Sequence, residues 1–102
     1  PHVTRALEIY KDRLICYSLG NFCTYKRFNL KGVNGIAPIV EVNVNKEGEF
    51  ISGNVISIKQ IGEGIPIIDK DQNVLIEIKK LIASDFPESK IVFNESSFTK
   101  VE

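Results

Sequence analysis

The residue with the clearest potential for chemistry is His2, the only histidine in this 102-residue chain. Imidazole is the commonest metal ligand in proteins, although a lone histidine is more often a solvated or core residue. Downstream, Ser18 and Asn21 place a hydroxyl and an amide after an apolar stretch, where such groups can orient a substrate or a metal-bound imidazole. Turn chemistry also explains them, because asparagine bonds its own backbone and Gly20 permits a sharp turn. We therefore expect Ser18 and Asn21 to support a site or the fold rather than to react.

A cationic pair, Lys26 and Arg27, follows in a polar segment. These side chains are candidates for contact with an anionic substrate, although solvated surface charge is the simpler explanation. Residues 1–33 hold six basic and two acidic side chains, and the rest of the chain holds seven basic and eleven acidic ones. An anionic ligand would be favoured near the basic third, but such unevenness also arises by chance.

No reactive nucleophile is recognisable. Ser18 has no identifiable histidine and acid partners, and no Gly-x-Ser-x-Gly pattern occurs. Cys16 lies in an apolar run and is expected to be a small buried hydrophobe, whereas the environment of Cys23 stays open. Two cysteines are too few for the disulfide framework of a small secreted domain, and they do not indicate the cellular compartment of the protein. The sequence therefore provides no confident catalytic residue.

The order of the N-terminal residues resembles one known family. Its motifs here are Pro1-His2-Val3, then Glu8-x-Tyr10-Lys11, an apolar stretch, and Tyr17-Ser18-Leu19-Gly20-Asn21-Phe22. This region is similar to CapA-type capsule synthesis proteins, also called poly-γ-glutamate synthesis proteins. That family has Gly-His-x-Pro-His-Val here and ends the following hairpin with Tyr-Ser-Leu-Gly-Asn-Phe. The motifs cover about the first quarter of the chain, and the rest matches by the order of its elements.

The resemblance implies a metallophosphoesterase-like fold, a four-layered α/β sandwich with a metal site at its strand ends. Residues 1–88 would be the C-terminal portion of that domain, incomplete at its N-terminus, and residues 89–102 a polar tail. The chain lacks an initiator methionine, and we interpret Pro1 as a cut point in a longer parent protein. His2 would be one metal ligand, and the other ligands would lie upstream in the parent.

The implied function is synthesis or export of an anionic capsule polymer at the bacterial cell envelope or its extracellular face. The parent would use a divalent metal (Mn, Mg, Zn or Fe), and whether it is a metal-dependent hydrolase stays open because fold does not fix activity. One imidazole cannot hold such a centre, so we expect this chain alone to bind no catalytic metal and to be inactive. Its expected partners are the missing N-terminal part of the parent and the anionic polymer.

The pattern around these residues predicts an α+β or α/β fold rich in β-hairpins. Strands are expected at 8–10 and 13–19, around a Lys11-Asp12 turn, and an irregular segment at 24–35. Alternating valines predict a strand at 39–45, which a turn connects to a partner strand at 50–61. A change of phase in that partner predicts a β-bulge near Gly53 or Val55. Residues 65–68 contain Pro66 and should form an edge or a connection.

One amphipathic helix is predicted near the C-terminus. Its apolar residues recur at helical spacing, Asp69 and Asp71 offer N-caps, and Pro87 should end it. The helix should pack on a sheet face. A short strand is expected at 91–93, and residues from Asn94 onward are expected to fray.

Composition narrows the class of protein. A formal net charge of zero argues against a nucleic-acid binder, and no run of 18 apolar residues suggests a membrane span. The alternative to the capsule reading is a noncatalytic β-rich structural or interaction module that shares a turn motif. Exposed strand edges and an apolar face would also favour self-association or binding of the missing segment.

Overall fold

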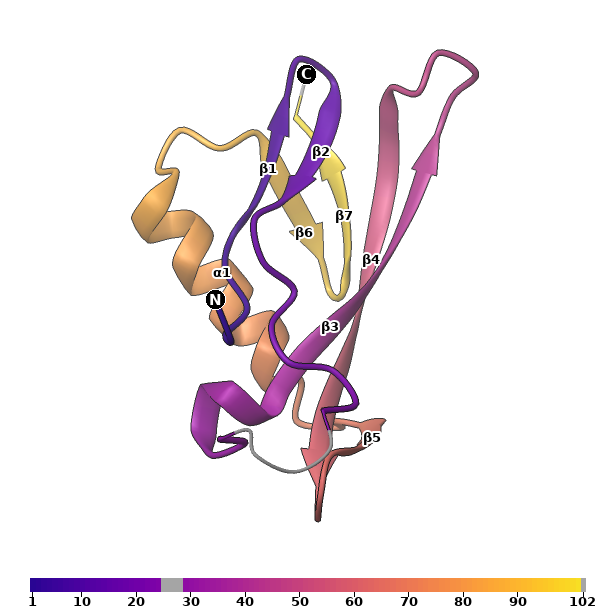
Figure 1. Ribbon diagram of the computed structural model, residues 1–102. Helices are drawn as coiled ribbons and strands as arrows, with labels where there is room; N and C mark the ends of the chain where they lie inside the picture. The colour runs from indigo at the N-terminus through magenta and orange to yellow at the C-terminus, as the bar shows by residue number, and fades with distance from the viewer. Residues whose placement is uncertain (25–28, 102) are drawn as a thin grey trace.

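The computed structural model describes residues 1–24 and 29–101. Over these residues the chain forms an α+β fold with one α-helix and seven strands, arranged in a two-stranded and a five-stranded antiparallel sheet (Figure 1). The expectation of an α+β fold with β-hairpins and one C-terminal helix is thus confirmed.

The small sheet is the hairpin β1 (Leu7–Tyr10) and β2 (Arg13–Cys16). Lys11 and Asp12 both have positive φ, 48° and 62°, which is the backbone that a tight two-residue hairpin turn requires. The second strand ends at Cys16 and not at Leu19 as expected. Leu19 instead forms an isolated antiparallel bridge with Thr4, because the chain bends after Cys16 to follow the N-terminal residues.

The large sheet is built on the hairpin β3 (Ile36–Val44) and β4 (Phe50–Ile61). A 3₁₀ turn at Gly32–Gly35 leads into β3, which therefore begins three residues earlier than predicted. The expected bulge near Gly53 or Val55 is wrong. The register shifts instead between Asn43 and Val44, where Ile51 is left without a partner.

Three short strands complete the large sheet along the other side of β4. They are β5 (Ile65–Ile68), which pairs with the end of β4, β7 (Ser97–Lys100), which pairs with the first half of β4, and β6 (Ile91–Asn94), which lies outside β7. β3 therefore forms one boundary of the sheet and β6 the other.

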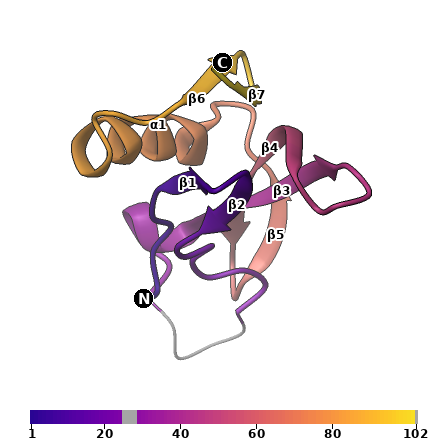
Figure 2. The same ribbon diagram turned by 90° about the horizontal axis from the view of Figure 1, so that it is seen from above.

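The helix α1 (Asn73–Asp85) packs against β3 and β4 and lies beside the β1–β2 hairpin (Figure 2). Its buried residues, Val74, Leu75, Ile78 and Ile82, join residues of both sheets in one core. Asp69, 2% exposed, accepts hydrogen bonds from the backbone N–H groups of Asp71 and Asn73 at 3.1 and 3.0 Å. Asp69 thus accepts from the N–H of Asn73, the first helical residue, although it lies outside the helix. Gln72 occupies the N-cap position itself.

The expectation that the chain frays from Asn94 onward is wrong. Phe98 on β7 is 1% exposed and stacks on Phe50, with ring centroids 5.6 Å apart. Gly53 of β4 makes room for it, since a Cβ there would lie 2.3 Å from the Phe98 ring. A segment that is polar in composition is therefore held in place by one aromatic side chain in the core.

Candidate functional site

The two N-terminal motifs lie side by side. Arg5 donates its backbone N–H to the carbonyl of Ser18 at 3.0 Å, and the Ser18 hydroxyl donates to the carbonyl of Val3 at 2.8 Å. Gly20 has φ +70°, and a Cβ at this position would lie 2.9 Å from the backbone nitrogen of Thr4. Ser18 and Gly20 therefore hold residues 1–5 against the end of the hairpin, which is a structural role for Ser18.

Asn21 connects this pairing to His2. The Asn21 side chain is 4% exposed, and its amide nitrogen donates to the carbonyl of Asn34 at 3.1 Å. That bond fixes the amide orientation, so Oδ1 is the atom that faces His2 Nδ1 at 2.9 Å. Because a carbonyl oxygen only accepts, His2 must carry a proton on Nδ1, and in the neutral ring the lone pair then lies on Nε2.

Two further side chains, missed by the sequence analysis, complete this arrangement. Asn34 donates from its amide to the carbonyl of His2 at 3.4 Å, and Gln60 donates to the carbonyl of Asn21 at 2.9 Å. Gln60, 9% exposed, also accepts from the backbone N–H and the hydroxyl of Thr24 at 2.9 and 3.1 Å. We call His2, Asn21, Thr24, Asn34 and Gln60 the polar corner.

The polar corner draws its residues from the N-terminal segment, the turn after β2, the 3₁₀ turn and β4. Gln60 had no distinctive signal, because β4 also contains Ser52, Asn54, Ser57 and Lys59. Asn34 had none, because Asn-Gly is also an ordinary turn sequence. Because side-chain to backbone bonds connect segments this far apart, the position of the imidazole depends on the whole fold.

The chemistry available in the polar corner is limited to one imidazole held in a defined tautomer. Among residues 1–24 and 29–101, no three side chains of histidine, cysteine, aspartate or glutamate gather as a metal-binding group would require. The contacts described for His2 come from the amides of Asn21 and Asn34, which suit orientation of the ring rather than coordination of a divalent ion. These residues therefore do not fit a full catalytic metal centre.

The remaining sequence candidates are Lys26, Arg27, Cys16 and Cys23. Lys26 and Arg27 lie outside the described residues. Cys16 is half-buried against the core, and burial raises the pKa of its thiol, as expected for an unreactive cysteine. Cys23 is exposed, with φ 55°.

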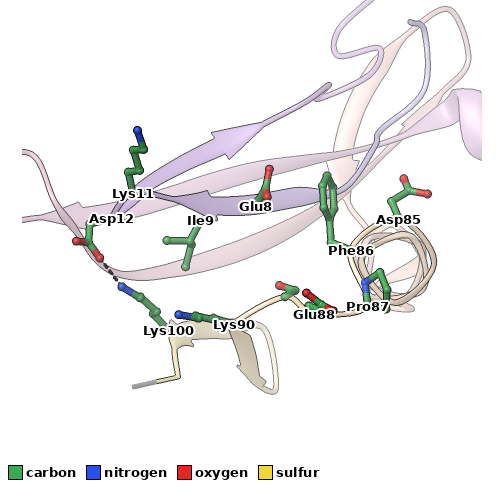
Figure 3. A pocket seen from close by; sticks show the side chains of 11 residues that line it. Glu8, Ile9, Lys11, Asp12, Asp85, Phe86, Pro87, Glu88, Lys90 and Lys100 are labelled. Atoms are coloured by element: carbon green, nitrogen blue, oxygen red, sulfur yellow. Dashed lines mark hydrogen bonds and ion pairs between the residues drawn. The ribbon is translucent and has the colours of Figure 1, made fainter.

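A groove of about 570 Å³ lies elsewhere, between the β1–β2 turn, the end of α1 and the strands β6 and β7 (Figure 3). Its charged side chains are of both signs: Lys11, Lys90 and Lys100 with Glu8, Asp12, Asp85 and Glu88. Lys100 forms an ion pair with Asp12, and Arg5 pairs with Asp85 at 3.0 Å. The hydrogen bond and charge of Lys100 lower the pKa of the Asp12 carboxyl.

Phe86 is an aromatic residue of the groove lining. Phe86 stacks on Tyr17 with ring centroids 5.5 Å apart, and the Tyr17 hydroxyl donates to Glu8. That hydrogen bond, with a smaller effect of burial, raises the pKa of the Tyr17 phenol. Because three lysines and four carboxylates line the groove together, neither sign of charge predominates there.

Comparison with known proteins adds no relative. No protein-family model matches the chain, and neither a curated protein nor a solved structure matches it significantly. In the part of the chain that the structure describes, no helix has the length and apolar character needed to cross a membrane.

Proposed function

We propose that this chain is the C-terminal portion of a CapA-like protein that takes part in synthesis or export of an anionic capsule polymer at the cell envelope. In this proposal, residues 1–88 belong to a metallophosphoesterase-like sandwich, and His2 is one ligand of a divalent metal whose other ligands belong to the parent. The observation that carries it is the hydrogen bond between His2 Nδ1 and Asn21 Oδ1, at 2.9 Å.

That contact supports the proposal because it joins the two motifs on which the resemblance depends. Pro1-His2-Val3 and Ser18-Leu19-Gly20-Asn21 are separated along the chain, yet one binds the other through backbone and side-chain bonds. Metal-binding histidines commonly donate their second ring nitrogen to an oxygen that fixes the ring orientation. Asn21 occupies that position relative to His2, so in the parent Nε2 would be the metal-binding nitrogen.

The simplest test is the coding sequence that precedes Pro1. The proposal expects Gly-His and one further residue directly before Pro1, and acidic, asparagine and histidine residues in earlier loops. Any other residues at those positions would remove the basis for the capsule reading.

A second test uses the full-length parent and measures bound metal after purification together with the capsule polymer made by cells. His2→Ala should reduce both. Asn21→Asp keeps an oxygen for His2 Nδ1–H and should retain more metal than Asn21→Leu, which removes it. Lys70→Ala, at an exposed position, is the matched control and should behave as the parent. Equal metal content in all four variants would contradict the role given to His2.

A noncatalytic interaction module is the second candidate, and a different observation favours it. The chain leaves large apolar side chains exposed along its strands, among them Val42, Val44, Ile51, Ile65 and Ile68, each at least 40% accessible. Exposed apolar strands are typical of surfaces that bind another polypeptide. If this hypothesis is correct, cells that carry the His2→Ala variant of the parent protein should make a normal amount of capsule polymer.

A further inference from the structure

The outer edge of β3 is one open strand edge of the large sheet. β3 is the terminal strand on its side, and no strand of the described residues pairs with its outer edge. The upper part of β3 diverges from the rest of the molecule together with β4 (Figure 1). Backbone groups at such an edge can pair with another strand.

The contacts of β4 show which β3 residues direct their backbone outward. Ser57 accepts from the N–H of Asp69 at 2.9 Å, and Val55 donates to the carbonyl of Ser96 at 2.9 Å. Both residues therefore turn their backbone groups away from β3. In an antiparallel pair their partners do the same, so Pro38, opposite Ser57, and Val40, opposite Val55, face the outer edge.

The alternation continues along β3. Val42 and Val44 face outward with Val40, whereas Asn45 turns inward and donates its N–H to the carbonyl of Glu49 at 3.0 Å. Pro38 has no N–H to donate. On the C-terminal side of Pro38, the outward donors of the strand are thus those of Val40, Val42 and Val44, which form what we call the valine edge.

The side chains of the valine edge continue the apolar face of the sheet. Val40 packs against the core, while Val42 and Val44 are 40% and 54% exposed. The side chains of Glu41 and Asn43, between them, point to the opposite face. An added strand could therefore gain backbone bonds and apolar contacts at the same residues.

We propose that the valine edge pairs with the same edge of a second copy of this chain, antiparallel, with the two-fold axis at Val42. In this register Val42 faces itself and Val40 faces Val44 of the other copy. Registers centred one residue either way leave one valine of each copy without an outward-facing valine partner. The Val42-centred register alone pairs all three donors of both edges.

The side chains on the opposite face favour the same register. It places Glu41 of each copy opposite Asn43 of the other, where an amide can donate to a carboxylate. A register centred on Glu41 would place two carboxylates directly opposite each other, which is destabilising. On the apolar face, Val44 of one copy would lie beside Val40 of the other and extend its core. The edge is thus complementary to itself, as a two-fold interface must be.

The inference does not depend on the capsule proposal, since it uses no residue of the polar corner. It is tested by sedimentation of the 102-residue chain over a range of concentrations. We expect a monomer–dimer equilibrium. Val42→Arg, which brings two cations together at the axis, should raise the dimer dissociation constant at least tenfold. Ile76→Arg, on the exposed face of α1, should leave it unchanged.

Circular dichroism of both variants should match the unsubstituted chain, because both side chains lie at the surface, 40% exposed for Val42 and 59% for Ile76. A chain that stays monomeric at all concentrations would overturn the proposal and leave the edge to a different polypeptide. Equal weakening by the two arginine variants would also overturn it.

The register is tested by disulfide formation in a Cys23→Ser background. Facing residues at a hydrogen-bonded position have Cα atoms about 5.5 Å apart, within the range of a disulfide. Val42→Cys should therefore form a covalent dimer under mild oxidation. Glu41→Cys and Asn43→Cys should cross-link far less, since each lies diagonally from its own copy at about 7–8 Å. Preferential cross-linking at position 41 or 43 would reject the Val42-centred register.

Discussion

The polar corner and the valine edge differ in how their polar groups are hydrogen-bonded. In the corner, the amides of Asn21 and Gln60 bond to groups of the same chain, and those bonds connect four separate segments. At the edge, the outward backbone groups of β3 have no strand to pair with among the described residues. The corner therefore fixes the geometry of one imidazole, whereas the edge keeps a capacity to bind another strand.

This difference also predicts how the two regions respond to substitution. A buried, internally bonded cluster loses stability when one group is removed, because its partners stay buried without a bond. An exposed edge tolerates substitution in the monomer and responds in association. Three changes test the contrast and a fourth tests an ion pair outside both regions; they are ordered from the largest expected effect.

Gly64→Ala should produce the largest loss of stability. Gly64 has φ +101°, and a Cβ there would lie 1.8 Å from the carbonyl oxygen of Thr24, the residue that bonds Gln60. Backbone must move, and the corner bonds of Thr24 with it, so we expect a loss of about 3 kcal/mol or more in the free energy of unfolding. Urea denaturation measures it.

Gly62→Ala is the matched control for that change. Gly62 also has positive φ, +56°, but nothing lies within 4 Å of the added Cβ. It should therefore cost only about 1 kcal/mol, the conformational penalty alone. Equal losses for the two variants would show that contact with Thr24 does not matter.

Asn21→Leu should have the next largest effect. It removes the acceptor of His2 and the donor to Asn34, which we expect to cost about 1–3 kcal/mol in the free energy of unfolding. Nitrogen NMR shifts of His2 should show that the Nδ1–H tautomer no longer dominates. Asn21→Asp should keep that tautomer, because a carboxylate oxygen still accepts from Nδ1–H. Retention of the tautomer in Asn21→Leu would mean that Asn21 does not set it.

Substitution of Asn43 should have a small effect, confined to association. In the proposed dimer Asn43 faces Glu41 of the other copy, so Asn43→Lys should tighten the dimer and Asn43→Asp should weaken it. Each cross-strand pair contributes about 0.2–1 kcal/mol. Both variants remove the amide that donates to Ser52 Oγ, and they differ in the sign of the charge they bring to Glu41 of the other copy. Sedimentation giving the same dissociation constant for both would contradict the register.

The exposed ion pair between Asp12 and Lys100 should have the smallest effect, visible only in acid. The hydrogen bond from Lys100 lowers the pKa of Asp12 below its ordinary 3.8. A lowered pKa in the folded state means that the stabilisation is present above 3.8 and is lost as pH falls through the folded-state pKa. Lys100→Gln should therefore flatten the acid limb of a stability–pH curve slightly, and Lys46→Gln should not. An unchanged acid limb in Lys100→Gln would exclude the pair as its cause.

Local patterns predicted much of the fold. The Lys11-Asp12 hairpin, the β3–β4 hairpin and α1 are all present because each carries its own signal in turn residues or in the spacing of apolar side chains. The errors lie where distant contacts decide. Phe98 is a single aromatic in a polar segment, and only the space above Gly53 shows that it belongs to the core.

The residues of the candidate site likewise fall into those that the sequence predicted and those that only the structure revealed. The spacing of the motifs selected His2, Ser18 and Asn21, and the structure brings these residues together. The spacing of the motifs did not select Asn34 or Gln60, because a side chain that bonds a distant backbone group leaves no periodic pattern in the sequence.

By itself, the sequence determined the fold class, the hairpins, the helix and the choice of His2 and Asn21, since these follow from local propensity and short-range spacing. Only the tertiary structure decided that Asn21 fixes the tautomer of His2, that Phe98 anchors the last strand, and that the valines of β3 face an open edge. Each of these depends on contacts between residues far apart in the chain, and such contacts exist only once the sheets and the helix have packed.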